Sequence, residues 1–445
     1  MSWSQRIESW FRFFLPGPFG LAVALTFIAV AASVLHGNSI ESISEDWQSG
    51  FWDPPLLVFT VQMALILLLG YSVAVSPPAN RFIERSLRHI HGQRGALILL
   101  TTSSMILCWI NWGLGLVMGA IMARKIAENL QNRNLNYNYP LLGAAGYSGM
   151  MTWHSGLSGS APLKAAEPNH LRELSGITEL PEVLSIQSTV LSTTNIGSFL
   201  MLLVLIPLAL LIFSKKNNNE IQIAAFTSPQ HENISPRGAE RFEHSKWIAG
   251  ILGLALFAIH IHALVLGNGN LNPNILNGIF LSLAIILHGS IAKFFSSIRA
   301  GMDGAAAILI QFPFYFGIMG ILRYGDLISS FTDWFLQWSS PGSQPIFIML
   351  SAGIVNFFVP SGGGQWAVQG PLILSICQES GLDLSLGIMA MAYGDQLTNM
   401  LQPFWALPLL AITGLKAHQV LPYTAFIMLI GVLIYSVLLI VLGYT

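Results

Sequence analysis

The chain has 445 residues, of which 53% are hydrophobic and only 9% are charged. Soluble domains carry about 25% charged residues, so this composition excludes a water-soluble globule and indicates a membrane protein. A net charge of -1 provides no basic surface for nucleic acid, and we exclude that class of partner. The two cysteines, Cys108 and Cys377, lie in apolar runs and predict small core residues, not a disulfide framework or a thiolate metal site.

Long apolar runs predict the membrane crossings, because a helix needs about 20 apolar residues to span a bilayer. The first run follows two arginines as a signal peptide would, but it exceeds an h-region of about 7 to 15 residues, and we expect it to stay attached. The predicted crossings are residues 15–36, 55–76, 139–163, 186–214, 247–267, 275–292, 304–323, 385–412 and 420–443, which makes nine.

Two further apolar stretches, 95–123 and 345–377, are interrupted near their middles by polar residues and glycines. Each could be one bent crossing or a re-entrant hairpin. Arg and Lys flank the first stretch on both sides, whereas acidic residues flank the second. Because cytoplasmic loops collect Lys and Arg, both ends of the first stretch are expected inside and both ends of the second outside. The sequence therefore predicts two re-entrant hairpins.

This topology puts the N-terminus in the cytoplasm and the C-terminus in the periplasm. It also leaves all but three of the 20 basic residues on the cytoplasmic side, the exceptions being Lys164, Arg172 and Arg323. If the two hairpins were ordinary crossings, the later loops would change sides and this bias would largely disappear.

The two halves of the chain contain the same types of membrane segment in the same order. A first repeat (1–214) and a second (275–445) each hold two crossings, a hairpin, a crossing broken by polar residues and a final crossing, with opposite starting sides. Residues 215–246 form a hydrophilic cytoplasmic linker, and residues 247–267 form a connecting crossing. We predict an all-α polytopic membrane protein with two inverted-topology repeats, the design of many secondary transporters.

Four interruptions should converge near the midplane, because non-helical backbone is tolerated there only inside protein or beside a watery cavity. Half-helix N-termini suit a carboxylate, and carbonyls suit a cation. The alternative is that small residues merely let the helices pack closely. The interruptions are Asn111–Gly113, Ser155–Ser160, Pro360–Gly364 and Thr398–Pro403, with the broken crossings at 139–163 and 385–412. Ser160, just before Ala161 and Pro162, is predicted to be a helix N-cap.

Asp395 is the only acidic residue well inside a predicted crossing. A carboxylate there costs about 3 kcal/mol on insertion scales and is a functional candidate by default. It could bind Na⁺ or carry a proton, and the plainer alternative is a structural hydrogen bond to a broken-helix N–H. His154 stands immediately before one interruption, where a histidine is more commonly structural. Trp112, Trp153, Trp366 and Trp405 recur beside the interruptions and could enclose a short acyl chain, although core or interfacial tryptophans are commoner.

Enzymatic function is not favoured. The chain has no His-Glu-x-x-His or paired Asp motif, and Ser158 in Gly156-Leu-Ser-Gly159 matches only part of the Gly-x-Ser-x-Gly pattern. It also lacks a Walker A sequence, so an ATP-driven pump is unlikely on sequence grounds. We expect no catalytic residues, and no cofactor beyond a possible bound Na⁺ near Asn111, Asn356 and Asp395.

Four long motifs carry a family resemblance over nearly the whole chain. They are Ile110–Ala120, Gln311–Gly317, Asn356–Trp366 and Ala392–Pro408. Together they closely resemble the short-chain fatty acid transporter family of bacteria, within the wider class of ion transporters with hairpins and broken helices. The chain departs from the family pattern in two places, with Asp395 where Glu is expected and His154 where Gly is expected.

The resemblance implies uptake of acetoacetate or butyrate across the bacterial inner membrane by a secondary transporter. Coupling to H⁺ or Na⁺ is assigned to Asp395 and Gln396. The alternatives are a passive carboxylate channel or exporter and, less favoured, an intramembrane hydrolase. Apart from the lipid bilayer and the substrate, a homodimer is expected only by analogy. The candidate substrate-binding residues are Asn111, Trp112, Ser155, Gly156, Ser158, Gly159, Ser160, Asn356, Ser361, Gly362, Gly363, Gly364, Thr398 and Asn399.

Overall fold

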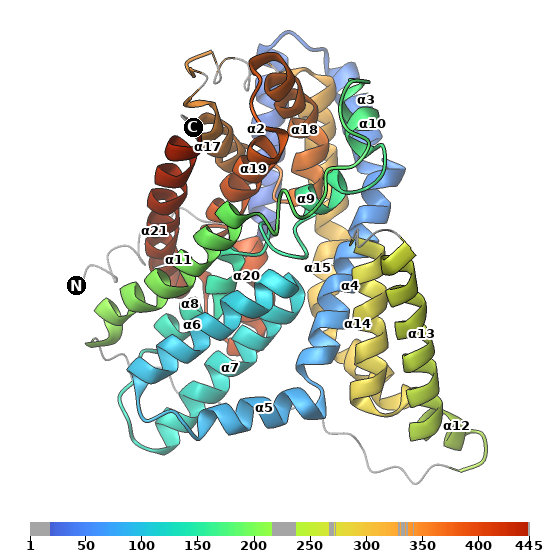
Figure 1. The fold of residues 1–445 in the computed structure, drawn as a ribbon, viewed down its shortest axis with the longest axis vertical. Coiled ribbons are helices and arrows are strands. Elements are labelled where there is room, and N and C mark those ends of the chain that lie inside the picture. The colour runs from blue at the N-terminus through green and yellow to red at the C-terminus, as the bar shows by residue number, and fades with distance from the viewer. Residues whose placement is uncertain are drawn as a thin grey trace.

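The computed structural model of the protein describes residues 18–215, 237–266, 273–327 and 342–443, together with positions 271, 330, 334 and 337–340. Throughout these residues the chain forms helices and connecting loops, with no β-strand (Figure 1). The all-helical prediction is thus confirmed for this part of the chain. The N-terminal arginines, and most of the predicted linker 215–246, lie outside the described residues.

Polar caps and prolines determine where several helices begin. Helix α4 (Pro54–Ala74) starts after Asp53, whose side chain accepts the Leu56 N–H, and prolines fill its first turn. Helix α5 (Pro77–Leu87) starts in the same way after Ser76. Helix α2 (Pro18–Leu35) falls within the first predicted crossing, 15–36. The shorter helices outside the apolar runs are α3 (Ile40–Phe51), α10 (His170–Ser175) and α12 (Glu240–His244).

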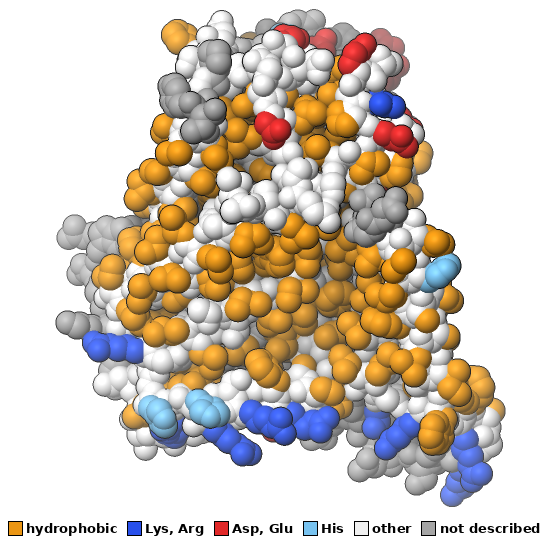
Figure 2. All heavy atoms as spheres, viewed as in Figure 1, with side chains coloured by type: hydrophobic (Ala, Val, Ile, Leu, Met, Phe, Trp, Pro, Cys, Tyr) orange, Lys and Arg blue, Asp and Glu red, His pale blue; other side chains and the backbone are white. Residues whose placement is uncertain are grey.

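Five described helical segments are long and apolar enough to cross a membrane by themselves. They are α4, α6 (Gln93–Ile110), α11 (Thr193–Leu210) with the 3-10 turn that continues it to Ser214, α13 (Lys246–Leu266) and α21 (Ala417–Gly443). Figure 2 shows a broad apolar band, with Lys and Arg gathered at one end of the molecule and mostly Asp and Glu at the other. These features identify a membrane-embedded protein.

Each of the two interrupted stretches folds as a pair of helices. Helices α6 and α7 (Trp112–Asn132) are separated by Asn111 alone and pack against each other. Helices α17 (Gln344–Phe358) and α18 (Gly362–Ser380) are separated by residues 359–361 and are also in contact. The first pair lies toward the basic end of the molecule and the second toward the acidic end (Figures 1 and 2).

The predicted broken crossings are interrupted close to the expected positions. The first consists of α8 (Tyr139–Tyr147), a 3-10 turn (Ser148–Met151), an irregular segment and α9 (Ser160–Ala165). In the second, α19 (Leu384–Asn399) stops and α20 (Pro403–Thr413) restarts after a short break.

The segment after the linker differs from expectation. Two separate crossings, 275–292 and 304–323, are predicted, but α15 continues without interruption from Ile291 to Tyr324. The chain turns earlier, because Gly289 adopts a left-handed φ of 67° and Ser290 caps α15. There α14 (Pro273–His288) and the first part of α15 meet at a bend of 118°. The polar residues near position 300 therefore lie within a helix, not in a loop between two crossings.

Helix α4 ties the two sides of the molecule together. It packs against α14 and α15 on one side and against α7 on the other. Helix α13 packs mainly on α14 and leaves most of its apolar surface facing outward. The irregular breaks of the chain lie among the helices on the α7 side.

Two glycines allow helices α7 and α8 to approach closely. A Cβ built on Gly119 would overlap the carbonyl oxygen of Gly146, and one on Gly146 would lie 2.5 Å from the carbonyl oxygen of Gly119. Small residues that bring helix backbones together are a common means of association in membranes, where no hydrophobic force drives helices together. This contact fixes α8, and with it the break that follows.

Replacing Gly119 with Val should therefore lower the free energy of unfolding by at least about 2 kcal/mol, because two backbones would have to separate. Gly197→Ala in α11 is the matched control, since no atom lies within 4 Å of a Cβ there. It should be neutral or stabilising by up to about 1 kcal/mol. Thermal unfolding in detergent, followed by tryptophan fluorescence, measures both, and equal unfolding temperatures would contradict the role of Gly119.

Candidate functional site

The tip of the first helix pair is built on Asn111. This residue is extended (φ -151°, ψ 118°), and its side-chain oxygen accepts the Leu114 N–H at 2.8 Å, so it caps α7. The next amide, of Trp112, donates to the Ser158 hydroxyl at 3.0 Å. The Asn111 Nδ2 is buried and has no hydrogen-bond acceptor. The first tip is thus joined to the first broken segment and still holds an unused donor.

The first broken segment satisfies its backbone through distant partners. The Ser155 N–H donates to the Gln396 side chain at 3.1 Å, and its carbonyl accepts from Asn195 at 2.9 Å. A Cβ on Gly156 would overlap the Trp109 carbonyl, so this position requires glycine. Buried amides in a membrane must find such partners, since no water is available to them.

The predicted N-cap at Ser160 is wrong by one residue. Gly159 is the N-cap of α9, and Ser160 is its first residue, with a buried hydroxyl that has no partner. The physical reason is that His154 takes the capping role. Its Nε2 accepts the Ala161 N–H at 3.1 Å, while Gly159 packs against the carbonyl of His154.

The second broken segment encloses Asn356 at the end of α17. The Asn356 Nδ2 lies within hydrogen-bond distance of the Asp395 carbonyl oxygen (2.8 Å), the Asn399 side-chain oxygen (2.8 Å) and the Thr398 hydroxyl (2.9 Å). Its own carbonyl accepts from Gln402 at 2.9 Å. The side chain of Asn356 therefore contacts the end of α19, and its backbone carbonyl contacts the break that follows.

Asp395 and His154 meet at the centre of this arrangement. The His154 Nδ1 lies 3.2 Å from the Asp395 Oδ2, and the two side chains are 0% and 1% exposed. The other carboxylate oxygen accepts from Asn399 at 3.2 Å. Because His154 Nε2 already accepts an amide N–H, the neutral imidazole carries its proton on Nδ1. The Nδ1 and Oδ2 atoms are in contact without a hydrogen bond between them, and neither has another partner. The pair is completely enclosed by protein.

The second tip also reaches the first broken segment. Ser361 caps α18 by accepting the Gly364 N–H at 3.3 Å. A Cβ on Gly362 would lie 2.6 Å from the His154 ring. Gly363 and Gly364 instead face aromatic rings of α4 and α15, Phe59 and Phe316. Of the predicted glycines in this tip, only Gly362 is in direct contact with the His154 side chain.

All four predicted interruptions are thus connected by contacts, and their polar residues are buried except for the half-buried Thr398. Sequence reasoning gave His154 no firm role and missed Asn195, Gln402 and Tyr435, which accepts from Gln396 at 2.7 Å. Gln402 stands within the predicted interruption Thr398–Pro403, whereas nothing local marks the other two. Asn195 and Tyr435 lie in otherwise apolar helices, and their partners are distant in sequence.

A pocket of about 260 Å³ opens above this network at the acidic end of the molecule. Its lining includes Ser188, Ser192, Ser385 and Tyr393. The Tyr393 hydroxyl donates to Asn195 at 3.0 Å, and Asn195 in turn holds the carbonyl of Ser155. These hydrogen bonds link the lining of the pocket to the first broken segment.

Comparison with known proteins agrees with the resemblance seen in the sequence. A profile of the family described as short chain fatty acid transporter matches residues 3–442. An Escherichia coli K12 relative is 34% identical over 444 residues, with 97% of this chain and 96% of the relative covered. A Haemophilus influenzae relative is 35% identical over 438 residues, covering 94% and 96%. Both relatives are named for short-chain fatty acid transport.

Two solved structures share the fold at low sequence identity. The Alcanivorax borkumensis YdaH transporter aligns with a TM-score of 0.53 at 12% identity, over 96% of this chain and 98% of that one. Neisseria gonorrhoeae MtrF, described with a class of antimetabolite efflux pumps, gives 0.51 at 16% identity, over 98% and 97%. The family assignment depends on the sequence relatives and on the nearly complete profile match, and on that basis this chain belongs to the short-chain fatty acid transporter family.

Proposed function

We propose that this protein carries short-chain carboxylates, such as acetoacetate or butyrate, into the cell, coupled to H⁺ or Na⁺, by alternating access. Its family is one of transporters and not of enzymes, and the protein is membrane-embedded. The substrate, the direction of transport and the coupling are our inference. The observation that carries it is the enclosed site at which both helix tips meet the first broken segment.

The site offers donors to an anion without a buried cation. Helices α7 and α18 begin beside Ser158 and His154 respectively, so the partial positive charges of both N-termini lie next to the same broken segment. The Asn111 Nδ2 and the Ser160 hydroxyl are buried there without partners. No Lys or Arg among the described residues is buried. Helix ends and neutral donors would therefore hold the carboxylate.

The charge distribution supports an orientation. Exposed arginines of α5, Arg81 and Arg85, belong to the basic end, which would face the cytoplasm under the positive-inside rule. The two helix pairs lie toward opposite ends of the molecule, as expected for inverted-topology repeats in a bacterial inner membrane. In such a design the site opens to each side in turn while the broken helices stay near the midplane.

Asp395 is the residue we assign to coupling, with Gln396 beside it linking Ser155 to Tyr435. An enclosed carboxylate must be neutralised, and a proton shared with His154 or a Na⁺ held by its oxygens would each do so. The His154 Nδ1 lies 3.2 Å from Oδ2, which is close enough for the two side chains to share an added proton. Substrate and ion would then share one enclosed volume, which is the physical basis of symport.

Uptake of labelled acetoacetate into proteoliposomes tests the proposal, with a pH gradient, a Na⁺ gradient or neither imposed. Protein-free liposomes correct for passage of the neutral acid. We expect accumulation above the external concentration with one of the two gradients only, because a symporter draws on a specific ion gradient. Equilibration without accumulation under every gradient would instead indicate a passive channel and contradict coupling.

Replacing Asp395 with Asn should abolish gradient-driven accumulation, because an amide side chain does not take up a proton under the conditions of the assay and cannot supply an anionic ligand. Asp53→Asn is the matched control, since Asn caps a helix as well as Asp does and this residue lies at the start of α4. Both variants should elute as folded protein from a sizing column. Concentrative uptake by the Asp395 variant equal to that of the control would rule out the coupling role.

A further inference from the structure

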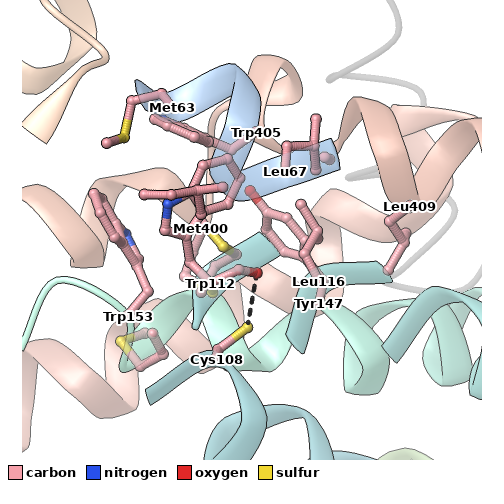
Figure 3. Packing of buried hydrophobic residues seen from close by; sticks show 14 of the residues in the cluster. Met63, Leu67, Cys108, Trp112, Leu116, Tyr147, Trp153, Met400, Trp405 and Leu409 are labelled. Carbon is pink, nitrogen blue, oxygen red and sulfur yellow. Dashed lines mark hydrogen bonds between the residues drawn. The ribbon is translucent and has the colours of Figure 1, made fainter. Parts of the chain in front are cut away.

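Three tryptophans form a tight cluster where the broken segments meet, and we call Trp112, Trp153 and Trp405 the indole cluster (Figure 3). Their ring centroids are separated by 5.3 Å (Trp112 and Trp405), 5.7 Å (Trp153 and Trp405) and 6.3 Å (Trp112 and Trp153). No ring side chain in the cluster is more than 4% exposed. Aromatic rings at these separations are in favourable contact.

Each indole comes from a different break in the helices. Trp112 begins α7, Trp153 lies between α8 and α9, and Trp405 stands in the first turn of α20. The remaining break also touches the cluster, since a Cβ on Gly362 would lie 2.9 Å from the Trp153 ring. The cluster therefore occupies the volume on which all four breaks converge.

The indole cluster is also adjacent to the charged pair. The Trp153 ring stacks on His154 with a centroid separation of 4.6 Å and an interplanar angle of 18°. His154 in turn contacts Asp395. An apolar wall and a polar, ion-bearing surface therefore lie side by side, as expected for a site that binds one oxygenated end and a short apolar chain.

Two polar atoms of the cluster have no partner in the protein. The Nε1 atoms of Trp112 and Trp153 are buried without an acceptor, although a buried Trp N–H usually has one. An indole N–H can only donate, so the matching ligand must bring acceptor oxygens. Carboxylate and keto oxygens have this chemistry, and a plain hydrocarbon chain does not.

We propose that the indole cluster is the acyl-chain subsite of the transporter and that it sets the upper limit of chain length. This inference rests on the proposed function and adds its substrate range. Trp112 and Trp153 donate to the oxygens of a short acid. The stiff rings leave no room for a long chain, because the Phe312 ring lies behind them, with its centroid 6.2 Å from that of Trp405. Short or oxygen-bearing acids such as acetoacetate fit, and longer saturated acids would have to displace an indole.

The test is competition against labelled acetoacetate uptake by unlabelled acetate and hexanoate, measured in proteoliposomes. Trp153→Leu and Trp405→Leu should each improve inhibition by hexanoate, relative to acetate, by about tenfold, because space opens for additional methylenes. Trp153→Phe keeps an aromatic ring but removes the N–H, so the apparent affinity for acetoacetate should fall about fivefold. A purely structural role would not change the preference between acids.

Trp366→Leu is the matched control. Trp366 is equally buried, but it lies outside the cluster, where its N–H donates to His170 at 3.0 Å. Its preference between the acids should stay unchanged. An unchanged preference in both cluster variants, or the same shift in the control, would overturn the proposal.

Variants that no longer transport are judged by binding. In detergent, acetate or hexanoate raises the unfolding temperature of any variant that binds it. Stabilisation by hexanoate in a cluster variant, without it in the unmodified protein, would support the subsite, and its absence in both cluster variants would overturn it. Failure of the unmodified protein to take up acetoacetate, with its binding intact, would count against the proposed transport and not against the subsite.

Discussion

The constraint on which the site depends is that backbone amides inside a membrane need partners within the protein. Each break in a helix releases N–H and C=O groups that only another segment can satisfy. Here the Trp112 amide donates a hydrogen bond to the Ser158 hydroxyl, and the Leu157 amide donates one to the carbonyl of Trp109 at 2.7 Å. These bonds fasten the breaks to one another. The same need that makes broken helices costly thus brings the functional residues to one place.

The side-chain donors left over after this mutual satisfaction carry the functional argument. Most buried polar groups in folded proteins are paired, and the backbone of the broken segments follows that rule through partners such as Asn195 and Gln396. Several unpaired donors lie beside the helix tips, among them the Asn111 Nδ2 and the indole N–H groups of Trp112 and Trp153. Because the backbone of the broken segments is hydrogen-bonded while these side-chain donors have no partner, the site is suited to an anionic ligand.

The hydropathy pattern and the helix-breaking residues predicted much of this fold. Long apolar runs located the five described helices that are long enough to cross a membrane, whereas the count of nine crossings stays a prediction. The Asn, Gly and Pro residues near positions 111 and 360 located both helix pairs, because these effects are local. The continuous helix through residues 292–304 was not predicted, since its polar residues suggested a loop. Helix α3 was also missed, because its exposed face is polar while it packs on α15. The contact between His154 and Asp395 joins residues far apart in the chain, and no local pattern encodes it.

That contact has a consequence for how the two positions can vary. His154 and Asp395 lie in contact, so a change of side-chain volume at one position acts directly on the other. A Glu at position 395 would extend one methylene further and collide with an imidazole already 3.2 Å from the shorter side chain. A Gly at position 154 would leave that space open and remove the cap from Ala161. The side chains at positions 154 and 395 therefore share one enclosed volume, and neither can be enlarged unless the other gives way.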